Sequence, residues 1–352
     1  MTNRLAIATT ATHVPMGAQV YQQEITVRAA AALASVGVDW PVQRVVARSL
    51  RSPLAGTLRL PMRRLERAGA RERRALGALV YPRGALVHRM ELGLPPARGE
   101  VLTMHDVVAW RFSDEGNPPA SARDELRAAA AVICVSQNTA DDVAEMFGVE
   151  RVHVAHPGVD DRFREPGSLT GAERVQLGIP GRYLLHAGGA SQRKNLEGLA
   201  AAWRSVHAAV GDVSLVLAGP PHSRRDELFR DLPRAIRVGR LPDGVLPKLM
   251  AGAEAVVVPS LYEGFGLPVL ESMAAGTPVV AAWTSSLPEV AGDAAVLVDP
   301  DGPAIAEGIR YVLGADFDRD GAVAAGFARS AGFDWTTSAE AHARVWKSVG
   351  HD

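Results

Sequence analysis

The 352-residue chain has one cysteine, three lysines and few aromatic residues, which make up 5% of it. The single thiol, Cys134, excludes an internal disulfide framework and a multi-cysteine zinc site, and it favours a cytoplasmic location. Because Cys134 lies in the apolar run Ala131–Val135, we expect a buried core thiol rather than a nucleophile. No apolar run approaches the length of a membrane-spanning helix. The opening run Leu5–Thr10 is too short for the core of a signal peptide, so we expect a first buried strand there.

The absence of two motifs argues against metal-dependent chemistry and against ATP hydrolysis. The ten histidines are scattered, without the His-x-x-x-His spacing of a metal site. No Gly-x-x-x-x-Gly-Lys-Ser/Thr loop occurs, which argues against ATP hydrolysis. We therefore expect no bound metal, no resident cofactor and no nucleic-acid partner, and cationic side chains are left to neutralise any bound phosphate.

The charge is distributed unevenly along the chain. The net charge is −1, yet residues 44–98 contain thirteen arginines, three glutamates and no lysine or aspartate. Such a segment is attracted to an anionic membrane surface or to an anionic acceptor. The alternative is a solvated basic face on a helix such as Pro61–Arg67. Both interpretations stay open, and the first predicts peripheral association with the inner face of a membrane.

Short apolar strands alternate with helical stretches along the chain, a pattern typical of parallel sheets covered by helices. Two similar runs predict an α/β protein with two Rossmann-like halves rather than one long sheet. We place their boundary at residues 157–180, where glycine and proline interrupt the pattern. The expected strands are Leu5–Thr9, Val42–Val46, Ala85–Arg89, Val101–Met104, Ala131–Val135 and Val152–Ala155, then Tyr183–Ala187, Ser214–Ala218, Ile236–Val238, Ala255–Val258, Val279–Ala282 and Ala295–Val298.

The candidate functional residues share one position in this pattern. An open parallel sheet binds ligands at the carboxyl ends of its strands. Each candidate follows directly after an expected strand, which favours ligand binding there. They are Gly17, His105, Ser136, Gly188, Arg240 and Glu263.

The segment Glu263–Glu271, with the sequence EGFGLPVLE, is the most informative part of the chain. It joins the apolar strand Ala255–Pro259 to an apolar helical run, and Pro268 suits the first helical turn. Gly264 and Gly266 let backbone N–H groups approach a ligand closely, and the helix N-terminus favours an anion there.

The two glutamates of this segment suit binding of a sugar nucleotide. We place Glu271 in the first helical turn, where its carboxylate can accept hydrogen bonds from vicinal hydroxyls such as those of a ribose. Glu263, on the loop, is placed to bind the hydroxyls of the sugar, on the other side of the phosphates. The alternative is a helix start with acidic residues favoured by the helix dipole alone.

Together these motifs resemble the family 4 retaining glycosyltransferases, and within them the mannosyltransferase-like branch. The resemblance covers nearly the whole chain and is densest between residues 100 and 300. Two departures are Gly17-Ala18, where two glycines are frequent, and His156-Pro157, where the family usually has Pro-Asn. The matching segments besides Glu263–Glu271 are Gly188–Asn195, Ser260–Tyr262, Ala275–Val280, Ser286–Gly292, His105-Asp106, Val135-Ser136 and His156–Asp160.

The resemblance implies the GT-B fold, in which two Rossmann-like domains with parallel sheets face a central cleft. It implies an acceptor-binding domain at residues 1–160 and a nucleotide-sugar-binding domain at residues 180–335. A final helix at residues 336–352 is expected to pack back on the first domain.

The same resemblance implies a role for each matched residue. A GDP- or UDP-linked sugar would bind the C-terminal domain, with Glu271 on the ribose and Glu263 on the sugar. Arg193 and Lys194 would hold the diphosphate and the charge that develops as the nucleotide departs. Further donor contacts are implied for Gly188, for Arg240 near the base, and for the backbone of Gly264, Phe265, Gly266 and Leu267.

In the first domain, Gly17 and His105 are the expected contacts of the acceptor. Histidine at the end of a strand is able to exchange a hydrogen bond with a sugar hydroxyl. Asp106 is expected either to orient His105 or to cap a turn. The acceptor itself, a sugar, a lipid-linked sugar or a small molecule, is left open.

These observations predict a retaining, metal-independent hexosyltransferase that transfers mannose or a related sugar. Front-face attack assisted by the departing phosphate is implied, because no second carboxylate is placed for a double displacement. The enzyme alternatives are a GT-B sugar-nucleotide epimerase and a phosphorylase, which would require a pyridoxal lysine. The non-enzyme alternative is an inactive nucleotide-sugar-binding scaffold.

Overall fold

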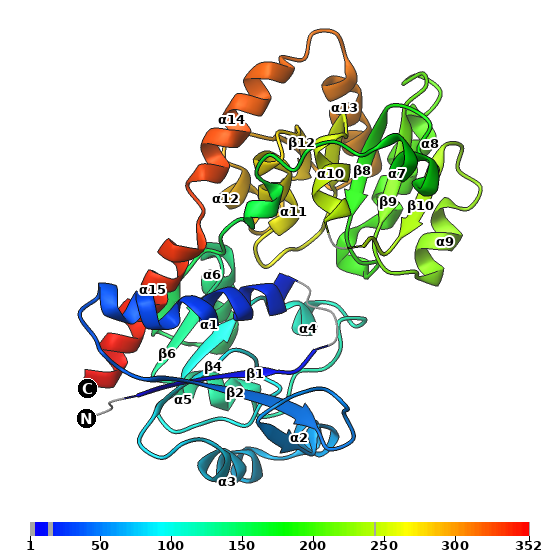
Figure 1. The fold of residues 1–352 in the computed structure, drawn as a ribbon. Helices are drawn as coiled ribbons and strands as arrows, with labels where there is room; N and C mark the ends of the chain where they lie inside the picture. The colour runs from blue at the N-terminus through cyan, green and yellow to red at the C-terminus, as the bar shows by residue number, and fades with distance from the viewer. Residues whose placement is uncertain (1–3, 13–16, 243, 352) are drawn as a thin grey trace. The chain divides into compact units, whose positions relative to one another are not determined.

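The computed structural model describes residues 4–12, 17–242 and 244–351, and the chain divides into two compact units (Figure 1). Unit 1 comprises residues 1–158 and 334–352, and unit 2 comprises residues 159–333. Each unit contains one parallel sheet with helices packed against it, which confirms the expected fold class of two Rossmann-like α/β halves.

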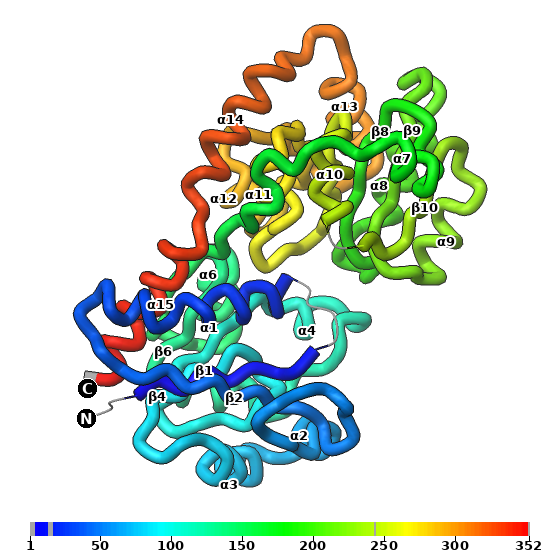
Figure 2. The backbone as a smooth tube through the Cα atoms, viewed as in Figure 1, coloured from blue at the N-terminus to red at the C-terminus, as the bar shows by residue number. Residues whose placement is uncertain are grey.

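In the described part of unit 1, seven parallel strands form a sheet in the order β3-β2-β1-β4-β5-β6-β7. Figure 2 traces β1 between its neighbours β2 and β4, where the strand order reverses direction. The edge strand β3 was not predicted, because three residues with a central arginine carry too little apolar signal. The strands are β1 (Leu5–Thr10), β2 (Val42–Ser49), β3 (Leu58–Leu60), β4 (Leu86–Arg89), β5 (Val101–Met104), β6 (Ala131–Cys134) and β7 (Val152–Val154).

Helices α1 and α15 lie side by side on unit 1 and contact each other along their lengths (Figure 1). The C-terminal helix α15 is thus part of unit 1, although almost the whole of unit 2 separates it from the other helices in sequence. The helices of unit 1 are α1 (Gly17–Ser35), α2 (Met62–Arg67), α3 (Ala70–Val80), α4 (Val108–Arg111), α5 (Ala122–Ala128), α6 (Gln137–Phe147) and α15 (Trp335–His351).

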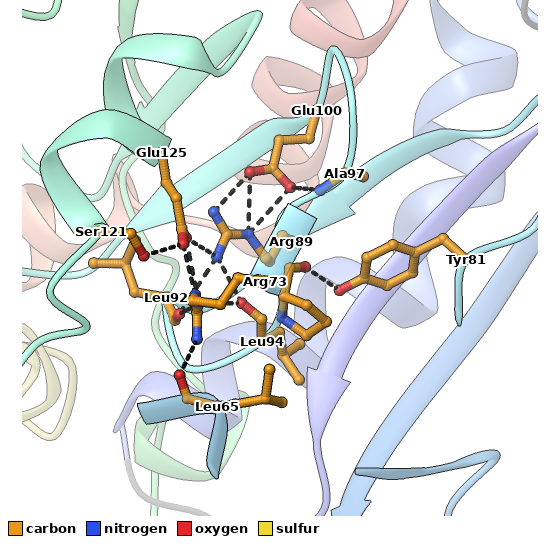
Figure 3. Close-up of polar contacts among 11 residues, drawn as sticks. Leu65, Arg73, Tyr81, Arg89, Leu92, Leu94, Ala97, Glu100, Ser121 and Glu125 are labelled. Atoms are coloured by element: carbon orange, nitrogen blue, oxygen red, sulfur yellow. Dashed lines mark hydrogen bonds and ion pairs between the residues drawn. The ribbon is translucent and has the colours of Figure 1, made fainter. Parts of the chain in front are cut away.

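A buried network of two arginines and two glutamates ties α3, α5, β4 and the segment before β5 together (Figure 3). Arg73 bonds Glu125 at 2.6 Å, and Arg89 bonds Glu125 at 2.8 Å and Glu100 at 2.6 Å. The guanidinium groups also donate to the carbonyl oxygens of Leu65, Leu92 and Leu94, and so fix the loop between β4 and β5. All four charged side chains are at most 2% exposed.

In unit 2, six parallel strands form a sheet in the order β10-β9-β8-β11-β12-β13. Its central strands are runs of Val, Ala and Leu that are buried along their whole length, as expected for a parallel sheet covered on both faces. The strands are β8 (Tyr183–Ala187), β9 (Ser214–Ala218), β10 (Ala235–Gly239), β11 (Ala255–Val258), β12 (Val279–Ala282) and β13 (Val296–Val298).

One face of this sheet packs on a hydrophobic core that centres on the fully buried Trp203 of α8 and includes α13. Between β11 and β12, Gly276 adopts a φ of +74° just after α11, which allows the chain to turn into the next strand. The helices of unit 2 are η1 (Asp161–Phe163), α7 (Gly171–Leu177), η2 (Gln192–Lys194), α8 (Leu196–Val206), α9 (Ser223–Phe229), α10 (Val245–Ala251), α11 (Leu267–Ala274), α12 (Leu287–Ala291), α13 (Gly302–Leu313) and α14 (Arg319–Ala331).

Candidate active site

Three of the predicted site residues meet at the carboxyl edge of the unit 2 sheet. Arg193 and Lys194 lie in η2, which follows β8, and Glu263 lies in the loop after the neighbouring strand β11. The Glu263 carboxylate accepts from Arg193 Nη1 at 2.7 Å and from Lys194 Nζ at 2.6 Å. The side chains of Arg193, Lys194 and Glu263 are 18%, 11% and 7% exposed, so the cluster remains open to solvent on its cationic side.

Glu263 is ionised in this cluster. Burial acts to raise its pKa, but the charges of Lys194 and Arg193, with hydrogen bonds from Lys194 and Ser260, lower the pKa to about 2. The Ser260 hydroxyl donates to Oε1 at 2.7 Å. One carboxylate therefore faces two cations, so these three side chains together carry a net charge of +1.

Asn195 orients the two cations through an unusual backbone conformation. Its φ is +52°, and its side chain both caps α8 and donates to the carbonyl oxygens of Pro259 and Pro300 at 2.9 and 2.7 Å. These bonds connect the end of β8 to the end of β11, so η2 is held against the Glu263 loop. A left-handed non-glycine residue costs energy and is typical of functional sites.

The glycine loop after β8 is held from behind by Arg225 of α9, a residue that sequence reasoning missed. Its guanidinium is 3% exposed and donates to the carbonyl oxygens of Gly188 and Gly189 at 2.6 and 2.9 Å. Gly219 lets the neighbouring loop approach, because a Cβ there would lie 1.9 Å from the Gly188 oxygen. No motif in the sequence marked Arg225 for this role.

His186, the fourth residue of β8, contributes a buried ring close to the same loop. Its Nδ1 lies 3.0 Å from the Val257 carbonyl oxygen, while its Nε2 has no hydrogen-bond partner among the described residues. Burial, helped by the nearby charges of Lys194 and Arg225, lowers the pKa of His186 to about 4, although the bond with the Val257 backbone opposes this. The ring is therefore neutral.

The loop from Glu263 to Leu267 is shaped by two serines that follow β12. Ser285 accepts from the Glu263 N–H at 2.9 Å, and Ser286 donates to the carbonyl oxygens of Glu263 and Phe265 at 2.9 and 2.7 Å. These bonds involve only backbone groups of the loop, whereas the Glu263 carboxylate bonds Arg193 and Lys194. The segment containing Ser286 had been noticed in the sequence, but these roles had not.

The remaining residues of the Glu263–Glu271 segment also take defined positions. Gly266 caps α11 with a φ of +108°, and a Cβ there would lie 2.8 Å from Leu287, so glycine is required. The Phe265 ring is buried and packs edge-on against Phe333 at 5.7 Å between ring centroids. Phe265 thus anchors the loop through its side chain, while Gly264 and Leu267 flank the turn into α11.

Glu271 lies just past the first turn of α11, in which it was predicted. The helix begins at Leu267, so Glu271 is its fifth residue, and the first turn contains no acidic residue. Burial and, to a smaller extent, the charge of Asp160 raise the pKa of Glu271 to about 7, while Arg162 opposes the shift. In this structure Glu271 therefore lies in a different electrostatic environment from Glu263, and no hydrogen bond or ion pair joins the two described side chains.

Arg240 and Gly188 lie at two other strand ends of the unit 2 sheet. Arg240 follows β10 and is exposed, whereas Gly188 follows β8 and lies close to Lys194, whose Cε would be 3.8 Å from a Cβ at that position. Arg240 lies after an edge strand, two strands away from the cation cluster.

The two predicted acceptor residues lie in unit 1. His105 follows β5, and its ring packs at 5.1 Å and almost perpendicular to Tyr21 of α1. Burial lowers the pKa of His105 to about 4 although a hydrogen bond with the backbone of Met90 opposes this, so the ring is neutral. Gly17, expected in a loop, is instead the first residue of α1; the preceding Pro15 and Met16 lie outside the described residues.

Neither a metal cluster nor a bilayer-crossing helix is found in the described residues. No group of three or more His, Cys, Asp or Glu side chains there could hold a metal ion. This includes the alternating Asp316, Asp318 and Asp320, of which Asp318 caps α14. No described helix combines the length and apolar character needed to cross a membrane.

Comparison with known proteins identifies the family. Residues 62–163 match the model described as Glycosyltransferase Family 4, and residues 181–315 match the model described as Glycosyl transferases group 1. The chain is 32% identical over 274 residues to O-antigen chain mannosyltransferase B of Escherichia coli, covering 72% of this chain and 70% of that one. The chain belongs to glycosyltransferase family 4.

Other family 4 relatives differ in their named reactions. The chain is 34% identical over 297 residues to D-inositol 3-phosphate glycosyltransferase 1 of Catenulispora acidiphila, covering 76% of this chain and 69% of that one. It is also 33% identical over 196 residues to an MMP alpha-(1->4)-mannosyltransferase of Mycolicibacterium hassiacum, covering 53% of this chain and 42% of that one. Family membership thus makes the protein a glycosyltransferase.

Solved structures agree in fold. The lipopolysaccharide glycosyltransferase WaaG superimposes with a TM-score of 0.70 at 17% identity, covering 97% of this chain and 99% of that chain. Anabaena Alr3699/HepE, solved in complex with UDP-glucose, gives a TM-score of 0.69 at 19% identity, covering 98% of this chain and 99% of that one. At such identities the likeness concerns the GT-B fold alone.

Proposed function

We propose that this glycosyltransferase transfers a hexose, mannose or a related sugar, from a GDP- or UDP-linked donor to an acceptor hydroxyl, with retention of configuration. Its acceptor is a sugar, a lipid-linked sugar or a small molecule. The reaction belongs to polysaccharide, glycolipid or glycosylated-metabolite synthesis. The observation that carries the proposal is the Arg193–Lys194–Glu263 cluster beside a glycine loop at the carboxyl edge of the unit 2 sheet.

The chemistry follows from the charges in this cluster. Arg193 and Lys194 bind the diphosphate and stabilise the negative charge that grows on it as the glycosidic bond breaks. Glu263 accepts hydrogen bonds from the sugar, and Glu271 accepts them from the ribose. No second carboxylate is placed beside Glu263 to act as a nucleophile, which supports front-face attack by the acceptor.

Incubation with a panel of GDP- and UDP-linked hexoses, with and without chelator, tests this proposal. We expect slow donor hydrolysis or transfer with one of them, unaffected by chelator, and an α-linked product from an α-linked donor by NMR. Binding without any turnover would favour the inactive scaffold, and interconversion of free sugar nucleotides would favour an epimerase. Inversion at the anomeric carbon would refute retention.

We also propose a cytoplasmic location with peripheral association at the inner face of the membrane. The support is the row of exposed arginines on α2, Arg63, Arg64 and Arg67, with the 81%-exposed Leu79 on the following helix α3. Exposed cationic and apolar side chains both suit an anionic bilayer surface.

A further inference from the structure

Arg225 of α9 lies behind the glycine loop that follows β8, and it is only 3% exposed. Its guanidinium donates to three backbone carbonyl oxygens, those of Gly188 at 2.6 Å, Gly189 at 2.9 Å and Pro220 at 2.6 Å. Gly219 makes room for this side chain, because a Cβ there would lie 2.9 Å from Arg225 Nη2. The guanidinium and the loop backbone therefore fix each other in place.

The bonds to Gly188 and Gly189 also set the direction of two N–H groups of the loop. A trans peptide is planar, with its C=O and N–H pointing in opposite directions, and no described peptide bond is cis. The N–H groups of Gly189 and Ala190 belong to the same two peptides as the bonded carbonyls, so they point away from Arg225. Neither N–H has a hydrogen bond among the described residues. Two successive N–H groups of this kind suit an anion.

The charge of Arg225 is not neutralised by a carboxylate. The side chain makes no ion pair among the described residues, and its neighbour Asp226 bonds Arg237 instead, at 3.2 Å. A buried cation without a carboxylate costs free energy, even when carbonyl oxygens accept its hydrogen bonds. An anion bound on the far side of the loop would supply the missing counter-charge.

We propose that Arg225 positions the donor diphosphate. It directs the Gly189 and Ala190 N–H groups at the phosphate oxygens, and it polarises the two peptides that it bonds, which strengthens hydrogen bonds donated from them. Its own charge adds to those of Arg193 and Lys194. This role rests on the proposed transferase function, because the anion is the diphosphate of that reaction. It goes beyond that function by assigning to the site a buried residue that does not touch the ligand.

Calorimetry on the full chain tests this role without any need for turnover. The ligands are inorganic pyrophosphate and the mono- and diphosphates of uridine and guanosine. Arg225→Gln removes the charge and keeps a polar side chain. It should weaken pyrophosphate, and the nucleoside diphosphate that the wild type binds more tightly, by about tenfold. The matching monophosphate should lose less, because it carries less negative charge.

Two further variants separate the charge from structural support. Arg225→Lys keeps the charge, so it should bind pyrophosphate more tightly than Arg225→Gln does, although it cannot reproduce the full set of carbonyl bonds. Arg224→Gln is the matched control. Arg224 is the preceding residue of α9 and donates to the Ala190 oxygen at 3.3 Å, but its charge is paired with Glu197 at 2.7 Å. This variant should change affinity by less than about threefold. Melting temperatures check folding.

NMR of the wild type examines the loop directly and does not depend on whether any Arg225 variant folds. With ¹⁵N-glycine labelling, the Gly189 amide proton should move downfield as pyrophosphate saturates the site, because it then donates to a phosphate oxygen. Gly189→Ala identifies the signal by its loss, and a Cβ there would meet nothing within 4 Å.

Four outcomes overturn the proposal. They are wild-type affinity in Arg225→Gln, equal losses in Arg225→Gln and Arg224→Gln, a Gly189 signal that does not respond to pyrophosphate, and equal losses in Arg225→Lys and Arg225→Gln for mono- and diphosphates alike. The last would leave Arg225 as structural support only. The proposed function fails differently. If pyrophosphate binds in an Arg225-dependent manner but no sugar nucleotide is turned over, the anion site stands and the transferase proposal falls.

Discussion

The two units each contain a cluster of arginine or lysine with glutamate, and the clusters differ in how deeply they are buried. In unit 1, Arg73, Arg89, Glu100 and Glu125 are at most 2% exposed, and they bond one another and nearby backbone and hydroxyl groups. In unit 2, Arg193 and Lys194 share the single carboxylate of Glu263 and remain 18% and 11% exposed. Similar chemistry therefore produces a fully buried network in unit 1 and a partly exposed cluster in unit 2, the latter being the proposed diphosphate site.

The difference in burial predicts which free energy each cluster affects. A fully buried ion pair contributes little net stability when complete, but removing one partner leaves a charge in a medium that cannot solvate it. Substitution of one charged residue of the unit 1 network should therefore lower the free energy of unfolding. In unit 2 the cations keep contact with water, so their loss should appear mainly in binding and catalysis.

The largest expected effect is on the fully buried network. Arg89→Met removes the partner that Glu100 and Glu125 share. It should lower the free energy of unfolding by about 3–5 kcal/mol, because the buried Glu100 loses its main donor and Glu125 keeps only Arg73 and Ser121. Urea denaturation followed by circular dichroism measures it. A loss below about 1 kcal/mol would mean that the network is not a structural hub.

The partly exposed cluster should respond in the opposite manner. Lys194→Ala and Arg193→Ala should each cost about 2–4 kcal/mol of transition-state stabilisation, measured as kcat/KM, with a much smaller change in unfolding free energy. Arg182→Ala is the matched control, since Arg182 pairs with Glu254 at the amino end of the same strand β8. Near-normal kcat/KM in both site variants would remove the diphosphate assignment.

The two clusters also show which features of the structure local sequence patterns can predict. Continuous apolar runs located the twelve strands that were predicted. Strand-to-loop junctions located Gly188 and Glu263, because parallel sheets gather such junctions at one edge, and the family resemblance added Arg193 and Lys194. The same reasoning missed Arg225 and the buried network. Their partners are carbonyl oxygens and charges up to 52 residues away in sequence, which no local pattern encodes.

A smaller difference concerns Glu271. It was predicted in the first helical turn, and it lies just past that turn because α11 begins at Leu267, directly after the cap residue Gly266.

Within unit 2, the two glutamates of the proposed donor site are expected to affect different ligands. Glu263→Gln should weaken binding of the sugar nucleotide by about tenfold or more. It should leave free nucleoside diphosphate unchanged or bound more tightly, because Arg193 and Lys194 lose their competing carboxylate. Glu271→Gln should weaken both ligands alike through the lost ribose contact. Calorimetry with both ligands decides it, and equal losses in the two variants would show that the roles are wrong.

Glu271 also predicts a pH dependence that Glu263 does not. Burial raises the pKa of Glu271 to about 7, whereas the cations lower the pKa of Glu263 to about 2. An ionised Glu271 accepts two hydroxyl hydrogen bonds, and a protonated one accepts fewer. Nucleotide affinity should therefore rise as pH increases from 6 to 8 by a few-fold, and this rise should vanish in Glu271→Gln. A flat profile in the wild type would exclude a titrating Glu271.

The smallest expected effect is on membrane binding by the exposed arginines of α2. Arg63, Arg64 and Arg67 are exposed on α2, and their only ion pair among the described residues is a loose one, 4.0 Å, between Arg64 and Glu72. If they meet an anionic bilayer, each contributes about 1 kcal/mol, and binding to acidic vesicles should fall as salt rises. Reversing all three to Glu should abolish vesicle flotation and leave nucleotide binding intact, since the cation cluster lies in unit 2.

The matched control reverses three exposed arginines of unit 2, Arg204, Arg230 and Arg310, so that net charge changes equally. If both triple variants lose flotation to the same extent, overall charge rather than the α2 surface is responsible. If the wild type shows no salt-sensitive flotation at all, the α2 arginines form a solvated face. A soluble acceptor would then be favoured, because it requires no membrane surface.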